Sequence, residues 1–95
     1  MLQIKVRYVP ADRSFTASFL SWERGSIWAR HYRLGGAVSA LLGKLRQSQL
    51  FSDDSIDRMS AHVFEQISSP WVEGDLRNSA HKPVYLAMLP HSGAR

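Results

Sequence analysis

Hydrophobic and polar positions alternate along the first part of the chain. Residues 2–9 place four apolar or aromatic side chains on one face and polar ones on the other: Leu2, Ile4, Val6 and Tyr8. This period of two residues predicts a strand. Residues 15–20 and 26–34 have the same character, and residues typical of tight turns separate the three segments. The pattern therefore predicts three consecutive strands that form an antiparallel meander.

The spacing of apolar residues then changes to that of helices. We expect the glycine pair 35–36 to end the third strand. Residues 37–47 carry apolar side chains three and four positions apart, which predicts a helix, and Gly43 within it favours a close approach to the sheet. A second helix is expected to start near residues 52–54 and to end at residues 68–70.

The last third of the chain adds one strand. Residues 71–82 are predicted to form a polar loop, residues 83–89 a strand that is paired or buried on both faces, and residues 91–95 a frayed tail. The order βββααβ indicates an α+β fold in which two helices cover one face of a small antiparallel sheet, within one domain over residues 1–95. The other face of the sheet is then either exposed or covered by a partner.

Composition narrows the class of protein. The chain has 95 residues, of which 44% are hydrophobic, enough for a single modest core. It has no cysteine, which excludes disulfides, thiolate zinc sites, iron–sulfur clusters and a cysteine nucleophile. No window is long and apolar enough to span a membrane, and the N-terminus lacks the apolar core of a signal peptide. We therefore expect a cytoplasmic protein that does not bind membranes.

The sequence contains no catalytic motif. The histidines are scattered over different predicted elements: His31, His62, His81 and His91. The acidic residues 53–57 lie at a predicted helix start, where capping accounts for them. No phosphate-binding loop or nucleophile elbow is present. We predict a protein that is not an enzyme and that has no cofactor and no metal; a small hydrolase is the third alternative, after two binding functions.

The distribution of charged residues is the sequence feature that indicates a binding partner most strongly. The net charge is +4, and residues 1–46 hold eight of the twelve lysines and arginines but only two of the eight acidic residues. A basic surface attracts polyanions or an acidic protein surface. On the third predicted strand, Trp28, Arg30 and Tyr32 share one face. If that face is outward, these residues form a basic, aromatic platform with Lys5 and Arg7.

The opposite orientation is the alternative. Trp28 and Tyr32 then belong to the core, and His31 and Arg33 are exposed instead, together with Lys5 and Arg7. Trp22 and Trp71 are expected to pack at the edge of the core. The candidate partner-binding residues are Lys5, Arg7, Arg24, Trp28, Arg30, Tyr32 and Arg33.

Two resemblances bear on function. Three strands followed by a helix, over residues 2–47, resemble the small DNA-binding domains at the N-termini of some phage and transposon integrases. In size and organisation the chain resembles the accessory proteins with which phages and mobile elements block a larger host machine, anti-CRISPR proteins among them. The second resemblance implies a non-catalytic inhibitor that docks on a protein or nucleoprotein complex and obstructs it.

That inhibitor is the leading prediction. The alternative is a regulator that contacts DNA or RNA directly through a basic, aromatic sheet face, because arginine and lysine bind phosphates and aromatic rings stack on bases. The sequence is compatible with a monomer or a homodimer.

Overall fold

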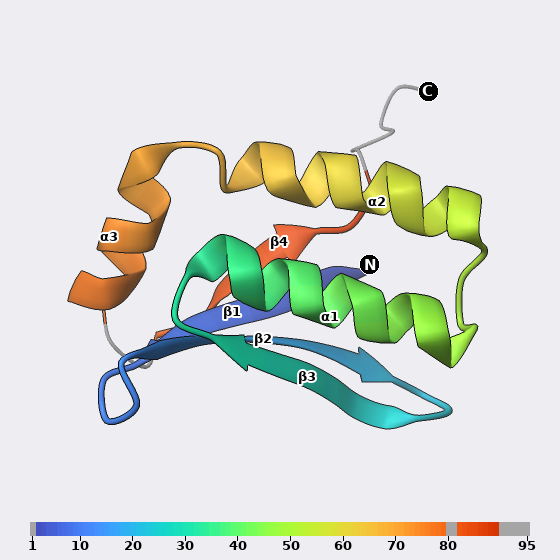
Figure 1. Cartoon of the computed structure of the whole chain (residues 1–95), viewed down its shortest axis with the longest axis horizontal. Helices are drawn as coiled ribbons and strands as arrows, with labels where there is room; N and C mark the ends of the chain where they lie inside the picture. The colour runs from blue at the N-terminus through green and yellow to red at the C-terminus, as the bar shows by residue number, and fades with distance from the viewer. Residues whose placement is uncertain (1, 80–81, 90–95) are drawn as a thin grey trace.

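A computed structural model describes residues 2–79 and 82–89. Its three helices lie on one side of a four-stranded antiparallel sheet with the order β3-β2-β1-β4, as Figure 1 shows. The elements are β1 (Gln3–Val9), β2 (Ser14–Ser21), β3 (Gly25–His31), α1 (Leu34–Ser48), α2 (Asp53–Gln66), α3 (Pro70–Asn78) and β4 (Val84–Ala87). The predicted α+β class, the meander and the helices on one face are confirmed. The predicted C-terminal tail, residues 91–95, lies outside the described residues.

The third helix corrects the predicted order and the predicted polar loop. Within residues 71–82, α3 runs as far as Asn78, and the order is βββαααβ. Its start has ordinary helix signals: the Ser69 hydroxyl accepts a hydrogen bond from the Trp71 N–H, and Pro70 occupies the first turn. Only Leu76 is buried on this helix, so its apolar stripe is too narrow to stand out in the sequence.

The third strand is shorter than predicted. It ends at His31, and α1 begins at Leu34, so Gly35 and Gly36 lie in the first helical turn rather than in a break between strand and helix. The N-cap residue, Arg33, makes no side-chain capping bond. Instead, its N–H donates to His31 Nδ1 at 3.0 Å, which turns the chain from the sheet into the helix.

The core lies between the sheet and the helices. α1 packs on β2 and β3, α2 on β4, and α3 on β1. Ala17 and Ala29 are paired across β2 and β3, and both are buried beneath α1. These small side chains give the helix room to approach the sheet, so the expectation that Gly43 does so is wrong. Gly43 is exposed, and a Cβ there would have no neighbour within 4 Å.

A tight hairpin joins β2 to β3. The buried Ser21 hydroxyl accepts hydrogen bonds from the N–H groups of Glu23 and Arg24, both at 3.1 Å. Gly25 completes the turn with φ of 70°, a conformation that glycine adopts at no steric cost. The hairpin therefore holds Trp22 at its tip, fully exposed.

Side chains of α1 and α2 form hydrogen bonds with backbone groups of the two outer strands of the sheet, β3 and β4. On β3, the Lys44 ammonium donates to the Trp28 carbonyl at 2.8 Å. On β4, the Gln66 side chain accepts from the Ala87 N–H at 3.1 Å and donates to the Ala87 carbonyl at 2.7 Å, as a neighbouring strand would. Unpaired edge groups invite other chains to extend a sheet, so both contacts protect against strand addition.

Two glycines of α1 are expected to respond oppositely to alanine. Gly43→Ala should raise the free energy of unfolding by about 0.5–1 kcal/mol, because alanine favours an exposed helix interior and nothing obstructs its methyl group. At Gly36, the added Cβ would collide with the His31 ring and displace it from the Arg33 N–H. We therefore expect Gly36→Ala to give no increase, and a net loss of about 1 kcal/mol.

Urea unfolding followed by far-UV circular dichroism measures both changes. Since each variant makes the same substitution in the same helix, each is the control for the other. An equal gain in both would contradict the contact between Gly36 and His31.

Candidate functional site

The face of the sheet opposite the helices is open, and its side chains line a shallow basin. Three strands contribute cations, hydroxyls and one indole. Its lining residues are Lys5, Arg7, Val9, Asp12, Thr16, Ser18, Ser26, Trp28 and Arg30. Because side chains alternate between the two faces of a strand, the outward positions are those that leave Ile4, Val6, Phe15, Ala17 and Ala29 in the core. The outward orientation of Trp28 and Arg30, one of the two alternatives left by the sequence, is therefore the one found.

The basin is predominantly positive. Lys5, Arg7 and Arg30 line it with one carboxylate, Asp12. Arg30 Nη1 lies 3.0 Å from Asp12 Oδ2, and both side chains are about half exposed. A solvent-exposed pair of this kind contributes little to stability, so a stronger anion can displace the carboxylate. The Thr16 hydroxyl lies between Arg7 and Arg30, and the Ser18 hydroxyl lies beside Lys5, so both add hydrogen-bond donors to the basin.

Trp28 is held in place from the helical side. Lys44 of α1 reaches the edge of β3, where its ammonium donates to the Trp28 carbonyl and lies 5.5 Å from the centre of the indole ring. A cation over an aromatic face is attracted by the electrons of the ring. The contact orients the indole, while 50% of the residue stays exposed to solvent.

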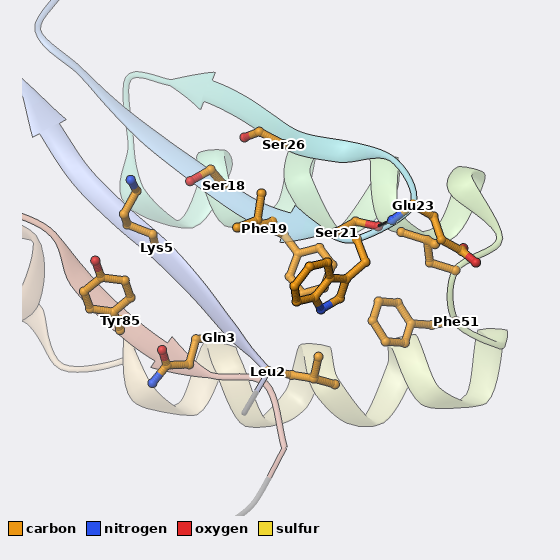
Figure 2. Close-up of a pocket in the computed structure, with 13 residues that line it drawn as sticks. Leu2, Gln3, Lys5, Ser18, Phe19, Ser21, Glu23, Ser26, Phe51 and Tyr85 are labelled. Carbon is orange, nitrogen blue, oxygen red and sulfur yellow. Dashed lines mark hydrogen bonds between the residues drawn. The ribbon is translucent and has the colours of Figure 1, made fainter.

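A second, more apolar hollow continues the basin toward the β2–β3 hairpin. Figure 2 shows Tyr85, Lys5, Ser18 and Ser26 toward one end of it and Phe51 at the other. The remaining lining residues are Leu2, Gln3, Phe19, Leu20, Ser21, Trp22, Glu23 and Leu50. Lys5, Ser18 and Ser26 line both hollows, so the basic basin is continuous with a hollow that reaches past the end of the open face to Leu50 and Phe51, between α1 and α2.

The structure brings together four of the seven candidate residues from the sequence: Lys5, Arg7, Trp28 and Arg30. Tyr32 lies just beyond β3, strongly exposed, in a neighbouring hollow that also includes Arg30. Arg24 is exposed in the hairpin turn, outside the residues that line the basin. Arg33 lies apart, because its guanidinium is bound to Glu73 of α3 at 3.0 Å, on the helical side.

Sequence reasoning missed Tyr85 and the supporting Lys44. Alternation along β4 does separate Tyr85 from the inward Leu86, but only the pairing of β4 with β1 places Tyr85 opposite Lys5. No local signal connects Lys44 with Trp28. The expectation that Trp22 and Trp71 pack at the core edge is wrong, because both are exposed and neither belongs to the core cluster.

The acidic residues at the start of α2 have a structural role. Ser52 is the N-cap, and its hydroxyl accepts from the Ser55 N–H at 3.1 Å. Asp53 and Asp57 bind Arg46 of α1 at 3.2 and 2.7 Å. The hydrogen bond that the Arg46 guanidinium donates to Asp57 raises the pKa of Arg46 above its ordinary value. These carboxylates thus join α1 to α2.

Among residues 2–79 and 82–89, no group of three or more histidine, cysteine or acidic side chains is arranged to hold a metal ion. Over the same residues, no helix has the length and apolarity needed to cross a membrane. Comparison with protein-family models, with curated proteins and with solved structures gives no match to this chain.

Proposed function

We propose that this chain is a non-catalytic binding protein whose ligand is nucleic acid, bound on the open face of the sheet. The observation that carries the proposal is the basin itself: Lys5, Arg7 and Arg30 surround a floor of hydroxyls beside a half-exposed tryptophan. Cations and hydroxyls bind phosphate oxygens, and an exposed indole stacks on a base. This pairing of chemistries suits a nucleic acid better than it suits a simple anion.

A second candidate function is the inhibitor that the sequence favours. Here the protein docks on a larger protein or nucleoprotein complex in the cytoplasm and blocks it sterically, as anti-CRISPR proteins do. Exposed apolar side chains at the β2–β3 hairpin support it, because Leu20 and Trp22 are strongly exposed and tryptophan is enriched at the centres of protein interfaces. On this hypothesis the basin meets an acidic patch or nucleic acid held by the complex.

Salt dependence tests the first proposal. Fluorescence anisotropy of labelled DNA and RNA oligonucleotides, titrated across a salt series, measures how many phosphates the protein neutralises. We expect Arg7→Gln to weaken binding and to make the negative slope of log K against log salt shallower by about 0.7, the share of one phosphate on a single strand. Arg58→Gln, on the exposed surface of α2, removes the same charge from the other side of the molecule and should leave that slope nearly unchanged.

Asp12→Asn is the matched change of opposite sign. It frees Arg30 from its carboxylate and removes one negative charge from the basin, so binding should become tighter. Absence of binding at low salt, or equal effects of Arg7→Gln and Arg58→Gln, would contradict the nucleic-acid proposal and favour a protein partner.

A further inference from the structure

We infer that the ligand is a single strand with unstacked bases, which crosses the four strands of the sheet; this rests on the proposed function. Strand register carries the inference. Trp28 is paired with Ser18, Ser18 with Lys5, and Lys5 with Tyr85. These four outward side chains form one row across the whole sheet, with an aromatic ring at each end. We call this row of Trp28, Ser18, Lys5 and Tyr85 the aromatic row.

A second row runs parallel to the first. Arg30 is paired with Thr16, and Thr16 with Arg7, so two guanidinium groups flank a hydroxyl. Each member lies two residues along its strand from a member of the aromatic row, a distance of about 7 Å. The open face thus has one row suited to bases beside one suited to phosphates, which is the arrangement that a strand lying across the sheet requires.

The spacing of the two rings is too wide for two adjacent bases of a stacked strand. Neighbouring strands lie about 4.8 Å apart, so three steps separate Trp28 from Tyr85 by about 14 Å. Successive bases of a stacked strand are separated by about 3.4 Å along the axis, roughly a quarter of that distance. Bases one or two nucleotides apart can therefore lie on the two rings only if the backbone is extended and the bases have left the stack. In a duplex, neighbouring pairs cover the base faces, so a single strand fits and a double helix does not.

Both rings are available for stacking. Tyr85 is 55% exposed, similar to Trp28, and neither takes part in an aromatic ring pair within the described part of the chain. Lys44 already orients the indole before any ligand arrives. A ring that is fixed in advance loses little conformational entropy on binding, so this preorganisation strengthens the interaction. The open face is positive, as a phosphate backbone requires.

The test compares single strands with the duplex. Probes are fluorescein-labelled DNA and RNA strands of about 12 nucleotides, and the DNA strand annealed to its complement. We expect the intact protein to bind at least one of the single strands about 10-fold or more tightly than the duplex. Trp28→Ala and Tyr85→Ala should each weaken single-strand binding about 5-fold or more, from the usual contribution of one stacked base. Trp71→Ala, an exposed aromatic residue on α3, is the control and should have no effect.

The outcomes separate this inference from the proposed function. If neither single strands nor duplex bind, the proposed function fails. If the duplex binds as tightly as the single strands, and Trp28→Ala and Tyr85→Ala bind normally while Arg7→Gln does not, nucleic-acid binding stands and the single-strand inference is overturned. Trp28→Phe and Tyr85→Phe keep a ring at each position and should retain most of the affinity, which separates loss of stacking from loss of folding. The DNA and RNA arms show whether the 2′-hydroxyl contributes.

Discussion

Leu76→Ala is expected to lower the free energy of unfolding by about 2–5 kcal/mol, the cost of a cavity at a buried leucine. Leu76 is only 2% exposed and is the buried residue of α3, where it belongs to the main core cluster. The neighbouring Arg77 reinforces the same contact, with its guanidinium 5.5 Å from the centre of the Phe15 ring and 5.9 Å from that of Tyr8. A large part of the stability of a small domain therefore depends on this helix.

Trp71→Ala is the matched control on the same helix. Its indole is 77% exposed, so we expect a change within about 0.5 kcal/mol despite the larger side chain removed. Urea unfolding followed by far-UV circular dichroism suits both variants, because tryptophan fluorescence would change with the substitution itself. If Leu76→Ala lowers the free energy of unfolding as little as Trp71→Ala does, α3 is not packed on the sheet. That result would agree with the polar loop predicted from the sequence.

Gln66→Ala is expected to cost about 2–4 kcal/mol and to promote self-association. The substitution removes both hydrogen bonds to the backbone of Ala87, and each backbone group left unpaired in a partly buried place costs roughly 1–3 kcal/mol. It also exposes the edge of β4, where another chain could add a strand. Chemical unfolding measures the first effect, and size-exclusion chromatography with light scattering measures the second.

Gln47→Ala provides the comparison, since Gln47 is an exposed glutamine near the end of α1. We expect it to leave both stability and molecular mass unchanged. If Gln66→Ala behaves in the same way, the amide does not protect the edge, and water replaces it at little cost.

Local patterns are sufficient for most elements of this fold. The alternation over β1 and β2, and the helical spacing over α1 and α2, come from side chains that must all reach one core, so the order of residues along the chain records them. Local patterns do not predict α3, because a helix with a single buried leucine has no helical periodicity of apolar residues. They do not predict the start of α1 either. Gly36 is required there by its contact with the His31 ring, whereas the low helix propensity of glycine suggests a break.

The residues of the candidate site also fall into those that the sequence identifies and those that only the tertiary structure identifies. Lys5 and Arg7 are outward because their strand has a clear apolar face, so sequence alone identifies them. β3 has no such face. Either Trp28 and Arg30 or Ile27 and Ala29 could face the core, and both orientations fit the alternation along the strand. Packing of α1 on the small Ala29 decides between them. Arg33 is removed from the site by Glu73, forty residues away in the sequence.

The sequence by itself determined the class of fold, the meander, the basic N-terminal half and the cations of β1, because each depends on short-range patterning or on composition. Only the tertiary structure decided which face of β3 meets solvent, that β4 pairs with β1, and that Tyr85 ends a row beginning at Trp28. The physical reason is that strand pairing and helix docking depend on contacts between distant segments, which no periodicity along the chain encodes.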